Sequence, residues 1–221
     1  MMEIKRELSR LALLSLILAT ASLSAFAQGE ALKDREVRPA FDFSLIQMPV
    51  EIVSIKLKGK AIEPGEKIQA DDDWLRGLSF TLKNVSDKPI SYVEIGLRFP
   101  HASDPRDFTT YLLKYGQEDS PRRNAGPQIA SVRPIQPGET MELALSVDKY
   151  PFFQHMMSST GVSPGVEAAS YFIDRIFFSD EPDVMWRGGK LLRRDPSDIN
   201  KFNVIERYTL PAKQAGQDYR F

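Results

Sequence analysis

The chain of 221 residues contains no cysteine and only two histidines, His101 and His155. Without thiols it can form neither disulfide bonds nor a thiolate metal site, so its stability must come from a hydrophobic core. Neither histidine has a second histidine or a carboxylate at the short spacing that zinc sites use. The sequence therefore predicts no metal centre and no cofactor.

An excess of charge of one sign is also missing, because 29 basic residues are balanced by 30 acidic ones. Proteins that bind nucleic acids usually need a basic face that releases counterions from the phosphates. Beyond residue 27, no apolar run approaches the roughly 20 residues of a membrane-spanning helix. These absences argue against a nucleic-acid partner and against a membrane span in the processed chain.

The start of the chain has the pattern of a bacterial secretory signal peptide. Basic residues precede the apolar run 11–18, and the small residues Ala25 and Ala27 follow it. Export machinery and its peptidase recognise this order. We expect residues 1–27 to be removed, the mature chain to begin near Gln28, and the product to be periplasmic or extracellular. Retention of the leader as an anchor is the alternative.

Three parts are expected in the chain. Residues 1–27 are the signal peptide, and residues 28–43, which are charged and lack a sustained period, are a flexible arm. Residues 44–221 are expected to form a single domain, with its C-terminal part either an elaboration or a small subdomain. The length of this part is sufficient for a sizeable core.

Alternation of apolar and polar residues, typical of half-buried strands, recurs along the domain. It runs through residues 53–57, 78–83, 93–99, 111–115 and 141–147. Residues 170–178 are apolar on both sides, which predicts a central strand. The turn-rich residues 84–89 predict a hairpin between the second and third of these strands. Short helices are expected only around 152–157 and after Ser197, which is placed to cap one.

The tripeptide Pro-Gly-Glu occurs twice, at residues 64–66 and 137–139, each time before a strand. Proline presets the first central dihedral of a type II turn, and glycine accepts the positive φ of the second. The flanking residues do not repeat, so the motif predicts two similar turns and not an internal duplication.

The strand that ends in Asn-x-Ser at residues 80–86, the strand 90–99, and the Pro-Gly-Glu turn within 135–143 resemble bacterial immunoglobulin-like domains of the FxLYD and cell-adhesion-related types. This resemblance covers about a third of the chain and implies a fold, not an activity. The tail, residues 180–196, is similar to exported bacterial proteins and adds no chemistry. The expected fold class is all-β: an immunoglobulin-like antiparallel β-sandwich with short helical connections and an irregular C-terminal extension.

One local motif raises the possibility that the protein is a hydrolase. Residues 161–165 match Gly-x-Ser-x-Gly, the nucleophile elbow of α/β-hydrolases. The residue after the nucleophile must donate its backbone N–H to the oxyanion, but Pro164 has none. Both histidines also precede Ser163, whereas that enzyme class places the histidine after the serine. We interpret the motif as a flexible turn and predict no catalytic residue.

Candidate binding residues are aromatic and basic. Trp186 and Arg187 lie in the densest basic cluster, where an indole beside cations is suited to a glycan or an acidic loop; pairing of these cations with nearby acids is the simpler interpretation. Tyr150, Phe152 and Phe153 form a second candidate, with a plug over the open end of the core as the simpler interpretation. These five residues are the predicted binding site.

The function expected from the sequence is an exported, non-enzymatic binding protein of the bacterial envelope, with a protein or an envelope glycan as partner. The alternatives are a carbohydrate-binding module, which requires Trp74 or Trp186 exposed beside a second aromatic ring, and a glycan-processing hydrolase. The hydrolase requires paired carboxylates, for instance at Asp174 or Asp180, about 5–10 Å apart in a cleft.

Overall fold

A computed structural model describes residues 32–101, 103–104, 106–116, 133–162 and 166–209. Strands make up 54% of the structure and helices 8%. The strands form two sheets, and every strand pair except β1 with β9 is antiparallel. The chain is therefore an all-β sandwich, and the residues from Lys33 onward form one compact unit.

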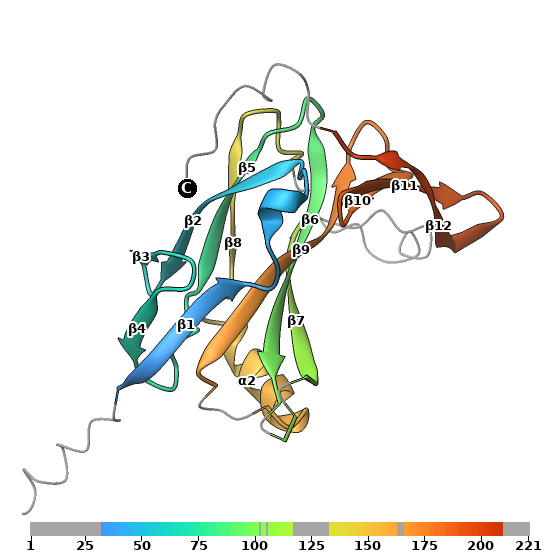
Figure 1. The fold of residues 1–221 in the computed structure, drawn as a ribbon. Helices are drawn as coiled ribbons and strands as arrows, with labels where there is room; N and C mark the ends of the chain where they lie inside the picture. The colour runs from blue at the N-terminus through green and yellow to red at the C-terminus, as the bar shows by residue number, and fades with distance from the viewer. Residues whose placement is uncertain (1–31, 102, 105, 117–132, 163–165, 210–221) are drawn as a thin grey trace, which may run out of the picture. The chain divides into compact units, whose positions relative to one another are not determined.

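The smaller sheet has four strands in the order β3-β2-β5-β8. Their bounds are β2 (Val50–Leu57), β3 (Lys60–Ile62), β5 (Ser79–Asn84) and β8 (Thr140–Ala144). The larger sheet has eight strands (Figure 1). Their bounds are β1 (Lys33–Pro39), β4 (Lys67–Ala70), β6 (Ile90–Pro100), β7 (Phe108–Gly116), β9 (Ala168–Phe178), β10 (Val184–Arg187), β11 (Lys190–Asp195) and β12 (Asp198–Arg207).

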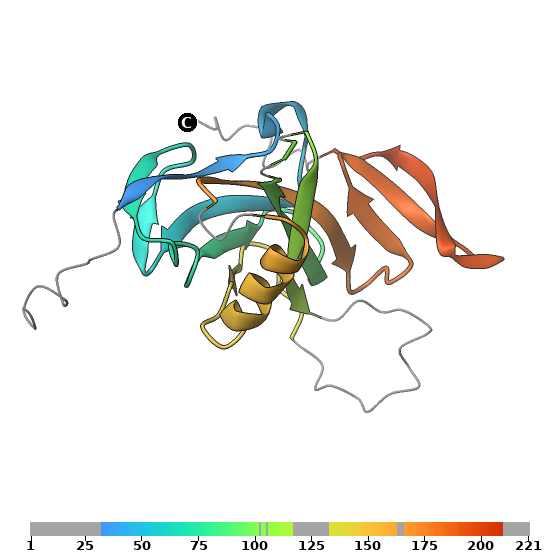
Figure 2. The same cartoon turned by 90° about the horizontal axis from the view of Figure 1, so that it is seen from below.

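The core lies between the two sheets. Apolar side chains from both sheets belong to one buried cluster; Phe80 of β5, for example, meets Tyr171 of β9 edge to face, with 5.2 Å between ring centroids. The helix α2 (Tyr150–Ser159) covers one end of this core (Figure 2). Its Phe153 packs against Phe99 of β6 and Tyr111 of β7, with ring centroids 5.4 and 5.1 Å away.

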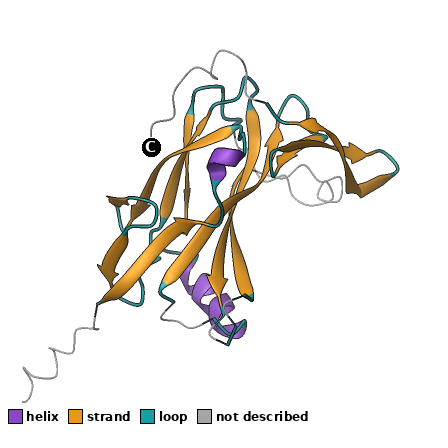
Figure 3. Cartoon of the chain, viewed as in Figure 1, coloured by secondary structure: helices purple, strands orange, loops and turns teal. Residues whose placement is uncertain are grey.

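Helix is scarce, as the sequence predicts. Within the described ranges there is one α-helix, α2, and one short 3-10 helix, η1 (Phe43–Leu45) (Figure 3). The helix expected around residues 152–157 is confirmed and slightly longer. The helix expected after Ser197 is wrong: residues 198–207 are β12, which pairs with β11. Ser197 instead bonds through its N–H and hydroxyl to Asp195 Oδ1, which closes a tight turn between two strands.

The expectation of a flexible arm over residues 28–43 is wrong for residues 33–39. Residues 33–39 form β1, which pairs with β4 on one side and with β9 on the other. Val37 in this strand is fully buried in the core. The segment reads as polar because charged residues flank Val37 on the outer face and because the buried face also carries Arg35, which is paired with Asp72.

The predicted hairpin between residues 78–83 and 93–99 is also wrong, because β5 and β6 lie in different sheets. Asn84 holds the corner where the chain crosses between the sheets. Its Nδ2 donates to the carbonyl oxygens of Lys88 and Ile135 at 2.9 and 3.0 Å. The expected turn residue thus stabilises a crossover and not a two-stranded hairpin.

Both Pro-Gly-Glu turns are confirmed. Gly65 and Gly138 have φ values of 81° and 82°, as type II turns require. In each turn the following glutamate, Glu66 or Glu139, accepts a hydrogen bond at 2.9 Å from the backbone N–H three residues earlier. The shared tripeptide therefore encodes the same closed turn at two unrelated places.

Candidate functional site

The larger sheet divides at β9 (Figure 1). One edge of β9 pairs with β6 over most of its length. The other edge is shared, with β1 alongside residues 168–171 and β10 alongside residues 176–177. Within the described part of the chain, residues 172–175 therefore have no strand neighbour on that edge. The side chains around this fork, on the face turned away from the core, form the candidate site.

A charged cluster lies at the centre of the fork. A β-bulge opposite Glu94 in the β6–β9 ladder accommodates Asp174 and Arg175 beside it. Arg175 donates from Nε and Nη2 to the Glu94 carboxylate at 3.0–3.1 Å. The Tyr92 hydroxyl donates to the same carboxylate at 2.6 Å, and Lys114 Nζ of β7 lies 3.4 Å from it.

Asp174 extends this cluster to β10. Its Oδ1 lies 3.0 and 2.9 Å from Nε and Nη2 of Arg187. Burial raises the pKa of Asp174, and its hydrogen bond with Glu94 raises it further. Burial also disfavours the charge of Glu94, but hydrogen bonds from Tyr92 and Asp174 and the charge of Arg175 outweigh it and lower the pKa of Glu94.

The charged cluster is suited to holding strands together. Its two carboxyl groups face three cations, those of Lys114, Arg175 and Arg187, so each carboxyl group has a cationic partner. Glu94 and Asp174 both contact Arg175, whereas glycoside hydrolases hold their carboxyl pair about 5–10 Å apart around the substrate. The cluster cross-links β6, β7, β9 and β10.

An arginine lies between two phenylalanines on the same face. Arg98 Cζ of β6 is 4.5 Å from the ring centroid of Phe108 on β7 and 4.4 Å from that of Phe172 on β9. Because β7 and β9 flank β6, the rings approach from opposite sides. Phe172 occupies its position because Gly96 has no side chain: a Cβ there would lie 2.3 Å from the ring. Such cation–π contacts contribute about 0.5–2 kcal/mol each.

Exposed apolar side chains surround this arginine. Phe108, Phe41 and Leu112 are 45%, 40% and 36% exposed, and the Phe41 ring centroid lies 6.4 Å from that of Phe172. Leu112 is paired with Gly96, the residue over which Phe172 lies. We call the surface formed by Phe41, Arg98, Phe108, Leu112 and Phe172 the aromatic surface. Apolar groups gathered on one face in this way are typical of interaction sites.

The structure separates the five residues predicted to bind. Trp186 is 1% exposed and donates from Nε1 to the Gln47 carbonyl oxygen at 3.1 Å, so its ring offers no surface, contrary to the expectation. Arg187 is half exposed and ion-paired with Asp174. Trp74 is fully buried as well. The stacking surface that a carbohydrate-binding module was expected to build on either tryptophan is therefore not formed.

The second predicted group divides between core and surface. Tyr150 and Phe153 are 5% and 3% exposed and stack on each other, whereas Phe152 is 66% exposed. Burial raises the pKa of Tyr150 to about 12, and the charge of Asp73 adds to this. The interpretation of this segment as a plug over the end of the core is correct for Tyr150 and Phe153, and only Phe152 is available to a partner.

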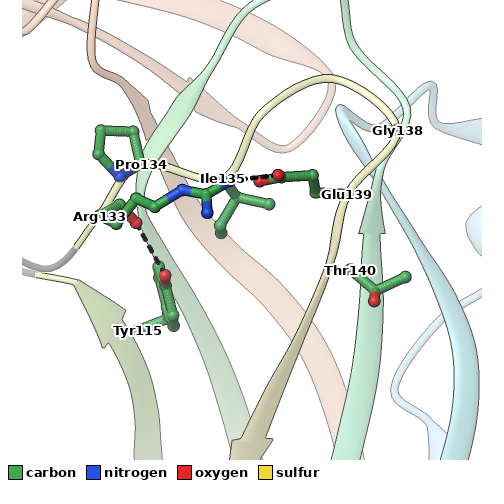
Figure 4. Close-up of a pocket in the computed structure, with 7 residues that line it drawn as sticks. All are labelled: Tyr115, Arg133, Pro134, Ile135, Gly138, Glu139 and Thr140. Atoms are coloured by element: carbon green, nitrogen blue, oxygen red, sulfur yellow. Dashed lines mark hydrogen bonds and ion pairs between the residues drawn. The ribbon is translucent and has the colours of Figure 1, made fainter.

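Two hollows lie away from the fork. One, of about 490 Å³, is lined by Tyr115, Arg133 and Glu139 among others (Figure 4). Arg133 and Glu139 pair with each other, and the Tyr115 hydroxyl donates to the Arg133 carbonyl oxygen at 2.9 Å. The other, of about 270 Å³, lies beside α2, and Asp72 in its wall is already held by lysine and arginine side chains. Neither hollow presents a free acid–base pair.

Several further expectations concern residues outside the described ranges. The signal peptide at 1–27, residues 28–31 of the arm, and residues 163–165 of the Gly-x-Ser-x-Gly motif lie there. Across the part of the chain that the structure describes, no group of three histidine or acidic side chains is placed to hold a metal ion. No helix in that part is long and apolar enough to cross a membrane.

The sequence pattern does not single out the key residues of the aromatic surface. In the pattern, Arg98 and Phe172 are ordinary strand positions, one polar in an alternating run and one in an apolar run. One signal does point to them: Gly96 inside a strand often marks a close approach of another group. Which group approaches depends on the neighbouring strand, and the partner of β6 was predicted wrongly.

Comparison of the chain with known protein families, curated proteins and solved structures finds no match. The function must therefore be argued from the site itself.

Proposed function

We propose that the protein is a non-enzymatic binding protein, exported to the bacterial envelope, that contacts another protein through the aromatic surface. The observation that carries this proposal is the gathering of exposed Phe41, Phe108 and Leu112 around a half-buried arginine on one sheet face. Aromatic residues and arginine are enriched in protein interfaces and supply most of their binding energy.

The competing functions have less support. A carbohydrate-binding module was expected to expose a tryptophan, and both tryptophans are buried. A hydrolase was expected to place Asp174 or Asp180 in a carboxylate pair within a cleft. Asp174 is committed to Glu94 and Arg187, and Asp180 is an exposed residue of a turn.

Export is supported by the order of charged, apolar and small residues in positions 1–27. Cell fractionation followed by N-terminal sequencing tests it. We expect a soluble periplasmic or extracellular product that begins near Gln28. A product that keeps Met1 in the membrane fraction would show a retained anchor, and one that keeps Met1 in the cytoplasm would overturn export.

Site-specific photo-crosslinking in the producing cell tests the interaction. A photoreactive amino acid replaces Phe108, and in a matched control it replaces Val53, which is 52% exposed on the smaller sheet. We expect a discrete covalent adduct from position 108 and none of the same mass from position 53. Equal adducts from both positions, or none from position 108, would contradict the proposal.

A further inference from the structure

Arg98 has no acidic partner in the described part of the chain. Among the described residues no hydrogen bond or ion pair reaches its guanidinium, which contacts the rings of Phe108 and Phe172. The other arginines on this face differ: Arg175 and Arg187 are paired with Glu94 and Asp174. The acids of the neighbouring cluster are already paired with other cations, so the positive charge of Arg98 is available to a ligand.

The surroundings of Arg98 define how a ligand can approach. Its Nε is buried and lacks a hydrogen-bond partner, whereas the two terminal nitrogens are not among the buried unsatisfied atoms and so reach solvent. The rings of Phe108 and Phe172 contact the guanidinium from either side. The free terminal nitrogens form the planar fork that matches the two oxygens of a carboxylate.

We propose that Arg98 binds a carboxylate of a protein partner, an aspartate or glutamate side chain flanked by apolar side chains. This inference rests on the proposed function, since it specifies the chemistry that the aromatic surface recognises. The positive charge of Arg98 requires an acid, and exposed Phe41, Phe108 and Leu112 require apolar neighbours around it. Small-molecule sites are usually enclosed hollows, whereas both hollows described above lie away from this face.

The arginine is also held in place before a partner arrives. Stacking between two rings restricts the guanidinium, so less side-chain entropy is lost when it binds. Gly96 makes this possible, because any larger residue there would collide with Phe172. A lysine at position 98 would keep the charge but could not present two parallel donors. Position 98 is thus specific for arginine under this proposal.

A peptide-display experiment tests the inference. It uses the full chain as purified from the producing cell, with whatever processing of the N-terminus the cell has carried out. The probe is a library of nonapeptides with a fixed central glutamate and randomised apolar flanks. Each enriched peptide is then remade with glutamine or phosphoserine at the centre. We expect the glutamine form to bind at least about tenfold more weakly, which is about 1.4 kcal/mol, and the phosphoserine form to bind no better than the glutamate form.

Protein variants locate the effect. R98Q is expected to lower the affinity for the glutamate peptide by the same factor of about ten and to leave the affinity for the glutamine peptide unchanged. The reason is that R98Q and the change of glutamate to glutamine remove the same interaction. R98K is expected to lose most of the affinity as well, and R133Q, an exposed arginine paired with Glu139, is the matched control with unchanged affinity. Thermal unfolding of each variant shows whether it is folded.

The outcomes separate the two proposals. If glutamine and glutamate peptides bind alike, or if folded R98Q and R98K bind like the wild type, the carboxylate inference is overturned. If peptide binding in that case is still lost when Phe108 is replaced by alanine, the proposed function remains intact. A lack of any enriched peptide also overturns the inference, while the crosslinks at position 108 remain the test of the interaction. Stronger binding of phosphoserine would assign the site to a phosphate instead.

Discussion

At the scale of single residues, buried polar side chains determine where the chain can turn. Asn84 is 1% exposed, and all its hydrogen-bonding groups are used. Its Nδ2 donates to two carbonyl oxygens, and its Oδ1 accepts from the N–H and the hydroxyl of Ser86 at 3.0 and 2.7 Å. A buried polar group without a partner costs about 1–3 kcal/mol, so this corner is sensitive to small chemical changes.

Asn84→Asp should therefore destabilise the protein by about 2–4 kcal/mol, because a carboxylate cannot donate to the carbonyl oxygens of Lys88 and Ile135. Urea unfolding measures this as a lower midpoint with an unchanged slope. The same substitution at exposed Asn200 is the control, with a change below about 1 kcal/mol. Equal midpoints for the two variants would contradict the role of Asn84.

Glu94→Gln should cost about 3 kcal/mol at pH 7, because it removes the closer of the two carboxylates paired with the partly buried Arg175. The folded-state pKa of Glu94 is lowered, so its stabilisation is present above the unfolded value of about 4.3 and is lost as the pH falls through the folded pKa. Urea unfolding at several pH values should show the difference from wild type shrinking below pH 4. A difference independent of pH would refute this account.

Asp174→Asn is the matched control for that pH dependence, since the folded-state pKa of Asp174 is raised whereas that of Glu94 is lowered. The raised folded-state pKa of Asp174 means that its contribution is complete below the unfolded value of about 3.9 and is lost as the pH rises through the folded pKa. The asparagine variant has no such loss. It should therefore gain stability relative to the wild type between about pH 4 and 7.

At the scale of elements, bulges and sheet partners decide which residues are buried. The predicted alternation places Val53 inside with Ile55 and Leu57, but Val53 is 52% exposed. A register shift between Ile52 and Ser54 in the β2–β5 ladder reverses the faces at this point. One extra residue in a strand exchanges its two faces, and the sequence pattern carries no clear mark of it.

The assignment of β1 to the sheet can be tested by a matched pair of substitutions. Val37→Ala should destabilise the protein by about 2 kcal/mol, because Val37 is fully buried between the sheets. Arg38→Ala, on the opposite face of the same strand and half exposed, should change stability by no more than about 0.5 kcal/mol. If both variants unfold at the wild-type urea concentration, residues 33–39 behave as an arm.

At the scale of the whole molecule, one core connects the two sheets. Trp74 follows β4 of the larger sheet in the chain, and Trp186 lies in β10 of that sheet; both are in the same buried cluster as Phe80 of the smaller sheet. A domain of this kind usually unfolds in one cooperative step. Because this cluster contains side chains of both sheets, we expect the sandwich to unfold as one unit.

Two single-tryptophan variants test this cooperativity. In Trp74→Phe and in Trp186→Phe, the remaining tryptophan should lose its buried environment at the same urea concentration at which far-UV circular dichroism reports loss of the strands. The substitutions themselves shift the midpoint, so the two signals are compared within each variant. A fluorescence transition that precedes the loss of strands in either variant would indicate separately unfolding parts.

The sequence by itself determined the features that depend on neighbouring residues. The alternating runs predicted the all-β class, the two Pro-Gly-Glu turns were predicted with their positive φ, and the helix near Phe153 was expected in place. These features follow from local dihedral preferences and from the two-residue period of a strand, which need no knowledge of the partner strand.

Only the tertiary structure decided which strands are neighbours, and the candidate site depends on that choice. Residues 33–39 became a strand because β4 and β9 provide hydrogen-bond partners, and residues 198–207 became a strand because β11 does. Phe108 and Phe172 meet at Arg98 only because β7 and β9 lie on either side of β6. Strand pairing is a non-local interaction, so the surface it builds is absent from any short stretch of the chain.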